Sequence, residues 1–283
     1  MHNDCPSTTA LRVAVRRAAH QVLDDPRVFD DPLALRILGL DADSVHDWGR
    51  WENSPLARVL RGALAVRSRH AENMLQAARQ RGVEQYVVLG AGLDTFACRQ
   101  AAAGHGGLRV FEVDRPAIQA WKQQRLRLAG IKVPDHCAWV AVDFEHQTLA
   151  AGLRQAGFDR NRPAFFSWLG VTMYLTAGAI DATLRAVAAL PAGSGIVFDY
   201  MIAPELLSPA ARAVLDGLAG RVAAAGEPFQ TFFVPDSLAG HLRGLGFARL
   251  DDMSPEALDA RYFQHRTDNL RAGKLARLMT AWV

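Results

Sequence analysis

The sequence predicts an α/β domain whose mostly parallel β-sheet is covered by helices on both faces. Between residues 85 and 200, short runs rich in β-branched and aromatic residues alternate with helical stretches, an order typical of parallel sheets. Residues 1–82 show only helical spacing of their apolar side chains, and the chain has no repeat or low-complexity linker. We therefore expect a single domain over 1–283, with a helical extension at 1–82 and a sheet-containing core at 83–283.

Each expected element has its own signal. In the extension, apolar periodicity predicts helices at 11–23, 32–38 and 56–81, and Gly39 and Gly82 end the last two. Apolar runs in the core predict five strands, at 85–90, 108–114, 138–143, 163–169 and 194–200.

After residue 200 the pattern is mixed. Helical insertions are expected at about 205–225 and 255–272. Candidate strands at 247–251 and 278–283 flank the second insertion.

The composition excludes several classes of function. The chain carries 32 Lys and Arg against 29 Asp and Glu, a net charge of +3, and the basic residues do not form a stripe that could follow phosphates. Three widely spaced cysteines, Cys5, Cys98 and Cys137, form neither a disulfide framework nor a metal-ligand pattern. We find no signal-peptide pattern and no run of about 18 uncharged apolar residues. We expect a cytoplasmic protein without a metal site, whose partner is neither nucleic acid nor a membrane.

A glycine-rich turn follows the first expected strand. The run YVVLGAGLDT, at 86–95, leads from hydrophobic residues into Gly90 and Gly92. Without side chains there, the backbone can approach a ligand at the carboxyl edge of the sheet. A dinucleotide fingerprint requires a third glycine where this chain has Thr95. By itself the pattern is equally compatible with an ordinary tight turn.

Acidic residues stand at the ends of the next two expected strands. In FEVD, Glu112 and Asp114 follow Gly90 by 22 and 24 residues, and a carboxylate there can bind both ribose hydroxyls of a nucleoside. Alternation places both side chains on one face, so either can have this role, and one can instead cap the following helix. Asp143 can bind an adenine amino group while Phe144 covers the ring, or can cap the next helix.

A basic residue lies within the apolar stripe of the helix expected at 56–81. Arg67 falls among Leu60, Leu64 and Ala71, and a buried guanidinium requires an anion. One of the chain's own acids can supply it in a salt bridge, or the carboxylate of an amino acid can be bound bidentately. Together with the glycine turn and the acidic strand ends, the second alternative describes S-adenosylmethionine.

These segments resemble one protein family over most of the chain. The similarity lies in VVLGAGLDTFACR, FEVDRPAIQAWKQQRL, VAVDFE, SWLGVTMYLT and GIVFDY, in the opening RRAAHQVLDDPRVFDDPLALRILG, and in the tail segments EPFQTFFVP and RYFQHRTDNL. The chain is similar to the leucine carboxyl methyltransferase family, and more closely to its bacterial branch of class I S-adenosylmethionine-dependent methyltransferases. The resemblance implies a Rossmann-like sheet of seven strands with an antiparallel last strand, and S-adenosyl-L-methionine as cofactor.

The resemblance also implies roles for particular residues. The family's cofactor-binding positions correspond to Arg67 for the carboxylate, Arg16 as a second basic contact, Gly90 and Gly92 in the turn, Asp114 at the ribose, and Asp143 with Phe144 at the adenine. One position departs from the pattern, because many relatives carry a glutamate where this chain has Leu169. This chain therefore lacks the family's acidic group at that position of the cofactor pocket.

The sequence nominates no catalytic residue. Three of the nine histidines lie near the expected lid or cofactor helices: His2, His20 and His70. Each is expected to be a surface or structural histidine unless it acts as a base. Tyr174 and Tyr200 follow strand ends, and the aromatic segment 229–233 can line an apolar pocket, but packing is the expected role of all of them.

The expected reaction is O-methylation of a small-molecule acceptor. A carboxylate is the favoured acceptor because it is ionised at pH 7 and needs no base. The alternative is a phenol or alcohol activated by a histidine. A nicotinamide-dependent oxidoreductase, disfavoured by Thr95, and a non-catalytic cofactor-binding protein are the remaining hypotheses. The helical extension and the insertion at 205–225 are expected to form the lid, since such segments build the substrate side.

Overall fold

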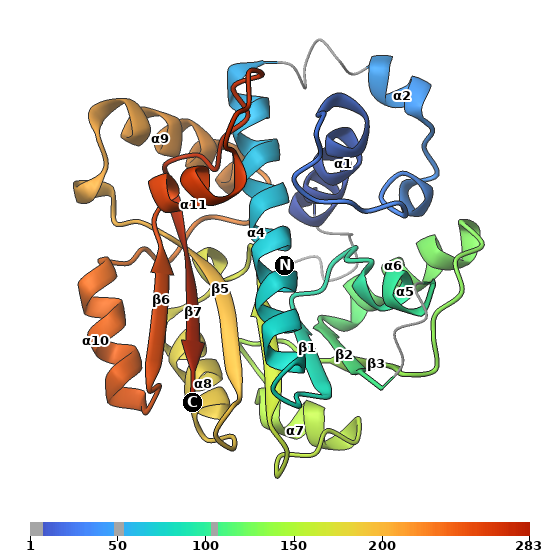
Figure 1. Ribbon diagram of the computed structural model, residues 1–283, viewed down its shortest axis with the longest axis vertical. Coiled ribbons are helices and arrows are strands. Elements are labelled where there is room, and N and C mark those ends of the chain that lie inside the picture. Colours follow the sequence, from blue (N-terminus) through green and yellow to red (C-terminus); the bar gives the residue numbers. More distant parts are fainter. Residues whose placement is uncertain (1–7, 48–53, 103–106) are drawn as a thin grey trace.

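The computed structural model describes residues 8–47, 54–102 and 107–283; Cys5 and His2 lie outside these ranges. Seven strands form one sheet in the order β3-β2-β1-β4-β5-β7-β6, with helices on both sides of it (Figure 1). Its strands are β1 (Gln85–Leu89), β2 (Arg109–Asp114), β3 (Cys137–Ala141), β4 (Ala164–Trp168), β5 (Gly195–Met201), β6 (Arg249–Met253) and β7 (Ala276–Trp282).

Only β7 runs against its neighbours in this sheet of the described chain. It pairs antiparallel with both β5 and β6, whereas β1 to β5 pair in parallel. Every residue of β1, β4 and β5 is buried, because helices cover both faces, and such strands read as continuous apolar runs. The predicted α/β class, with a mostly parallel sheet of seven strands and an antiparallel last strand, is confirmed.

The helices start where the sequence offers a suitable first turn. Proline occupies the first turn of α4, α6, α9, α10 and α11, where its missing N–H is not needed. The α-helices are α1 (Thr8–Leu23), α2 (Ala42–Asp47), α4 (Pro55–Arg79), α5 (Phe96–Ala102), α6 (Pro116–Leu128), α7 (Leu149–Gln155), α8 (Ala177–Ala188), α9 (Pro209–Ala224), α10 (Pro235–Leu245) and α11 (Pro255–Tyr262). Short 3-10 turns are η1 (Arg36–Leu38), η2 (Thr172–Tyr174) and η3 (Pro204–Leu206). Among the described helices, none has both the length and the apolar character needed to cross a membrane.

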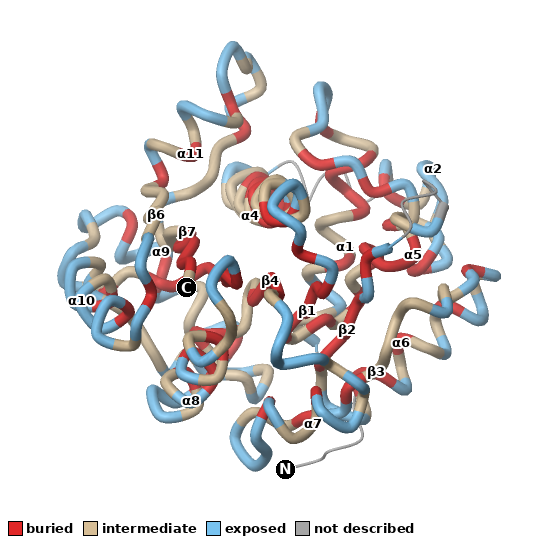
Figure 2. The backbone as a smooth tube through the Cα atoms, turned by 60° about the horizontal axis from the view of Figure 1, so that its bottom comes forward, coloured by how far each residue is buried: buried red, intermediate tan, exposed pale blue. Residues whose placement is uncertain are grey.

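Two hydrophobic layers lie on opposite faces of the sheet. Along β1, Val87 and Leu89 pack with residues of α7, α8 and α10, while Tyr86 and Val88 pack with residues of α4 and α5. This alternation follows from the two-residue period of a strand. Figure 2 shows the central strands as buried and the outer surfaces of the helices as exposed.

Three elements after residue 200 differ from the prediction. Strand β6 begins at Arg249 and not at 247, because Phe247 is buried in the core before the strand pairing starts. Helix α11 ends at Tyr262, and not near 272, because the Asp268 carboxylate accepts hydrogen bonds from Leu270 N and the Arg266 guanidinium, a local turn that replaces the helix. Helix α10 was not predicted, although Pro235 and Gly246 mark its two ends.

Candidate cofactor site

The glycine turn after β1 requires both of its glycines. Gly90 and Gly92 have positive φ angles of 68° and 46°, which residues with a Cβ atom rarely adopt. A Cβ at Gly90 would lie 2.3 Å from the Cγ2 methyl of Val171, which follows β4. The N–H of Gly92 donates to the Oδ2 atom of Asp114 at 2.7 Å. At the carboxyl edge of the sheet, the turn is therefore packed against Val171 after β4 and hydrogen-bonded to Asp114 at the end of β2.

The structure distinguishes the two acids of β2. Glu112 is a middle residue of β2, paired with Val88 of β1. Its side chain forms a buried ion pair with Lys122 of α6. Burial raises the pKa of Glu112, and the Lys122 ammonium opposes that rise. Asp114 lies at the strand end, where its two oxygens accept the N–H groups of Gly92 and Arg115. Of the two carboxylates, only that of Asp114 is at the glycine turn and partly exposed.

Asp143 and Phe144 follow β3 at the same edge. Asp143 Oδ1 accepts the N–H of Glu145 at 3.1 Å, so it stabilises the turn after the strand. Helix α7 begins only at Leu149, with Thr148 as its N-cap residue, so Asp143 does not cap that helix. The Phe144 ring is half-buried, with its centroid 6.0 Å from that of Trp168 on β4. An acid and an aromatic ring thus stand side by side along the chain, both partly open to solvent.

Arg67 projects from α4 towards the ends of β4 and β5. Helix α4 starts at a Ser54 cap, whose Oγ accepts the N–H of Ala57, and the helix runs across the sheet (Figure 1). The Arg67 Nη1 atom lies 2.9 Å from Asp199 Oδ2. Gly170, with φ of 72°, leaves room for the guanidinium, because a Cβ there would lie 2.6 Å from Arg67 Nη2. Arg67 therefore has one of the chain's own acids as its partner.

Helix α1 lies over the glycine turn. A Cβ at Gly92 would lie 3.7 Å from the Cβ of Ala10. Arg16 is half-buried on this helix. Its neighbour Arg17 reaches the loop after the turn and donates to Asp94 Oδ2 at 3.1 Å and to Ser68 Oγ of α4 at 3.3 Å. The extension and the cofactor turn are thus in direct contact.

A network of charges that the sequence did not reveal connects these segments. Arg17 pairs with Asp31 and Asp94, and Arg99 pairs with Asp31 and Glu72. Although burial opposes it, the surrounding carboxylates raise the pKa of Arg17, and the neighbouring cations lower the pKa of Asp94. The network joins α1, the loop before η1, α4 and the start of α5. The only local signal for this network is the pair Asp94 and Thr95 at the end of the LGAGLDT motif. Several of its hydrogen-bonded partners, such as Arg17 with Asp94, lie more than sixty residues apart in the sequence.

The two described histidines near the lid are both engaged in structure. His20 is 1% exposed; its Nδ1 lies 2.7 Å from Asp24, and its Nε2 accepts the N–H groups of Val28 and Phe29. His70 is fully buried between the hydroxyls of Tyr262 and Thr280, and burial lowers its pKa to about 4.

Aromatic residues gather where β4 and β5 end. The Tyr174 ring centroid lies 5.4 Å from that of Phe229, which is 6.2 Å from that of Phe232. All three rings are partly exposed, and Met173 and Met201 pack beneath them. These residues form an apolar surface beside η2. Tyr200, by contrast, is buried and donates to Asp252 on β6, so its role is packing.

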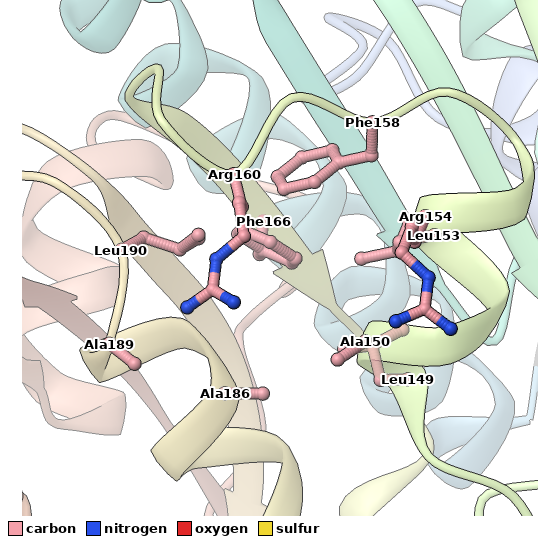
Figure 3. Close-up of a pocket in the computed structure, with 10 residues that line it drawn as sticks. All are labelled: Leu149, Ala150, Leu153, Arg154, Phe158, Arg160, Phe166, Ala186, Ala189 and Leu190. Carbon is pink, nitrogen blue, oxygen red and sulfur yellow. The ribbon is translucent and has the colours of Figure 1, made fainter.

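A groove of about 210 Å³ opens between α7 and α8. Figure 3 shows Arg154 and Arg160 at its rim and Phe158 and Phe166 at its wall. Its core residues belong to the layer under α7 and α8, on the face of the sheet opposite α4. It contains none of the residues at the glycine turn, and we do not assign it to the cofactor.

Comparisons with known proteins agree on one class. The family model described as "Leucine carboxyl methyltransferase" matches residues 10–188. A relative from Bacillus subtilis, "Putative S-adenosyl-L-methionine-dependent methyltransferase YktD", is 30% identical over 295 residues, covering 96% of each chain. A relative from Mycolicibacterium gilvum, "Putative S-adenosyl-L-methionine-dependent methyltransferase", is 36% identical over 204 residues, covering 68% of this chain and 65% of its own. A solved structure, a putative methyltransferase from Thermobifida fusca, has a TM-score of 0.59 at 20% identity, covering 99% and 96% of the two chains.

The chain is an S-adenosylmethionine-dependent methyltransferase, with a Rossmann-like fold and with S-adenosylmethionine as its cofactor. It belongs to the leucine carboxyl methyltransferase family. The nicotinamide-dependent and non-catalytic alternatives are thereby set aside. The glycines at 90 and 92 and the acid at the end of β2 fit a nucleoside cofactor, because they combine a partly exposed backbone turn without side chains with a partly exposed carboxylate.

Proposed function

We propose that the enzyme transfers the methyl group to a carboxylate oxygen of a small-molecule acceptor. The observation that carries this proposal is the state of His20 and His70. Both rings are buried and use both of their nitrogens in hydrogen bonds, and a general base must reach the acceptor's proton with a free nitrogen. A carboxylate, with a pKa of about 4, is already ionised at neutral pH and needs no base. The matching family is also named for a carboxyl acceptor.

The cofactor residues belong to the same proposal. Asp114 would bind the ribose hydroxyls, and Asp143 with Phe144 would hold the adenine. The remaining contacts are the backbone at Gly90 and Gly92, the Arg67 guanidinium at the cofactor's carboxylate, and Arg16 as a second basic contact. Two observations support these roles. The Gly92 N–H donates to Asp114, and Gly170, which has no side chain, leaves room for the Arg67 guanidinium.

The protein's contribution to the reaction is orientation and the exclusion of water. The bound cofactor supplies an electrophilic methyl group on a sulfonium, and methyl transfer is an in-line displacement. The apolar surface of Tyr174, Phe229 and Phe232 lies at the carboxyl edge beside η2, where an acceptor's apolar part can pack. Helix α1 covers the glycine turn, which supports its role, with the rest of 1–82, as a lid. We place this single-domain enzyme in the cytoplasm, without a nucleic-acid partner.

A hydroxyl acceptor is the second candidate function. Tyr174 lies at the same edge of the sheet, but burial raises its pKa. Its phenol is therefore harder to ionise at neutral pH, which makes it a poor general base. An acid such as Asp199 lies nearby, although its two oxygens are already engaged by Arg67 and Gly170. The hydroxyl hypothesis thus requires a base that is released from its present contacts.

The pH dependence of the rate tests the choice of acceptor. With a carboxylate acceptor, the rate should stay nearly constant from about pH 6 to 9, because protonation is complete only well below pH 5. The measurement is the single-turnover rate at saturating cofactor, so that slow product release does not flatten the profile. A panel of small carboxylic acids and matched phenols provides the acceptors.

Histidine variants serve as the control. His70→Asn should leave the shape of the profile unchanged, because the buried ring, with its lowered pKa of about 4, is already neutral across this range. A rate that climbs through pH 6.5 and loses that rise in His20→Asn or His70→Asn would replace the carboxylate proposal with the hydroxyl one.

A further inference from the structure

Asp199 lies on β5 at the level where the neighbouring strand β4 has just ended. The two strands pair in parallel, with Trp168 opposite Phe198, so the next residues, Leu169 and Asp199, stand at the same level of the sheet. Leu169 packs into the hydrophobic layer on the α4 side. The carboxylate at this level therefore comes from β5, and its side chain is 6% exposed.

The carboxylate of Asp199 connects three segments. Its Oδ1 accepts the N–H of Gly170 at 2.6 Å, and its Oδ2 accepts Arg67 Nη1 at 2.9 Å. Its own carbonyl oxygen accepts the Thr172 hydroxyl at 2.7 Å. Asp199 is thus fixed by the loop after β4, and it fixes Arg67 in turn. A charged, nearly buried pair of this kind restricts a side chain that would otherwise have many rotamers.

The contact with Asp199 uses one end of the Arg67 guanidinium. Within the described ranges, the hydrogen bond from Nη1 is the only one that Arg67 makes. The donors on Nε and Nη2 are left for another acceptor, and a planar fork of donors is suited to a carboxylate. The Arg67 side chain is 14% exposed, so part of it reaches solvent.

We propose that Asp199 is a positioning residue for the cofactor's amino-acid carboxylate: it holds Arg67 by Nη1 and presents the remaining donors of the guanidinium. This inference rests on the proposed role of Arg67. It also gives the direction of the effect of a substitution. If Asp199 acted only through its charge, neutralising it would strengthen the attraction between Arg67 and an anion. If Asp199 positions Arg67, neutralising it weakens binding.

The test compares two ligands that differ in the amino-acid part. S-adenosylhomocysteine has the carboxylate, whereas 5′-methylthioadenosine has the same nucleoside without it. Calorimetry would give both dissociation constants for the wild type, Asp199→Asn, Arg67→Ala and Asp252→Asn. Asp252, on β6, is a matched control, because its carboxylate also accepts hydrogen bonds from an arginine, Arg277, and from a second donor, the Tyr200 hydroxyl.

Asp199→Asn should weaken binding of S-adenosylhomocysteine about tenfold or more, the scale of a hydrogen bond to a charged group, and change binding of 5′-methylthioadenosine less than about twofold. Asp252→Asn should change neither constant. Tighter or unchanged binding of S-adenosylhomocysteine by Asp199→Asn, with Arg67→Ala selectively weakened, overturns the positioning role alone. If Arg67→Ala itself shows no selective loss, the proposed carboxylate site is wrong.

A second variant displaces Arg67 without altering Asp199. In Gly170→Ala, the new Cβ would lie 2.6 Å from Nη2 and 2.7 Å from Nη1 of Arg67, and the same selective loss is expected. Gly130→Ala is its control, because φ there is 62° and no atom lies within 4 Å of the added Cβ. Equal ligand selectivity in Gly170→Ala and Gly130→Ala would contradict the proposal even if Asp199→Asn failed to fold.

Discussion

A Lys122→Met variant should lose about 3–5 kcal/mol of unfolding free energy at pH 8, because it leaves the Glu112 carboxylate buried without its partner. Both side chains of the pair are 2% exposed, and the Lys122 ammonium lies 5.6 Å from the centre of the Trp139 ring. Urea denaturation followed by circular dichroism measures the loss. Lys132→Met, at an exposed position of the loop between α6 and β3, is the matched control.

The loss should depend on pH in a defined direction. Burial already raises the pKa of Glu112, and removal of the ammonium raises it further. A carboxyl group whose pKa is higher in the folded state than in the unfolded state contributes stability below the unfolded value, about 4.3, and this contribution is lost as the pH rises through the folded value. The variant should therefore be closer to the wild type at pH 5 than at pH 8.

The double variant Glu112→Gln with Lys122→Met checks the cause. Without the charge, much of the lost stability should return, because an uncharged amide costs less to bury than an isolated carboxylate. A single variant within about 1 kcal/mol of the wild type at pH 8 would show that Glu112 does not depend on this partner.

Asp114→Ala should weaken cofactor binding by about 1.5–3 kcal/mol, which is about 10- to 150-fold in the dissociation constant. Asp114 has two roles: it is proposed to bind the ribose hydroxyls, and it accepts a hydrogen bond from the Gly92 N–H. S-adenosylhomocysteine and 5′-methylthioadenosine should be affected alike, because both contain the ribose. This common loss distinguishes Asp114 from Arg67, whose removal should affect only the first ligand.

Glu112→Gln is the comparison for the ribose assignment. It should change cofactor affinity much less than Asp114→Ala does, because Glu112 faces Lys122 inside the sheet. A larger loss in Glu112→Gln than in Asp114→Ala, measured on folded protein by calorimetry, would reverse the assignment of the ribose acid.

The parts of the fold that the sequence predicted are those with local signals. The buried strands β1, β4 and β5 were predicted because sequestration on both faces makes them uniformly apolar. The end of α11 was not predicted, because the turn at Asp268 competes with the helix through side-chain hydrogen bonds.

The candidate site divides in the same way. The glycines of the turn were found from their spacing, and the alternation of β2 left Glu112 and Asp114 equivalent. The family resemblance pointed to Asp114, and the fold supplies the physical reason, because α6 brings Lys122 to Glu112. Asp199, 132 residues from Arg67, became its partner through the packing of α4 on β5. No periodicity in a single sequence contains that information.

The place of β7 in the sheet bears on the order in which the protein can assemble during synthesis. β7 is the last of the seven strands along the chain, yet it lies between β5 and β6. Until residues 276–282 leave the ribosome, one edge of β5 has no strand partner, and β6 is not connected to the sheet. Unpaired edges of this kind favour association with other chains. The nascent protein is therefore most vulnerable to aggregation while Asp199 is already made but its strand has one neighbour.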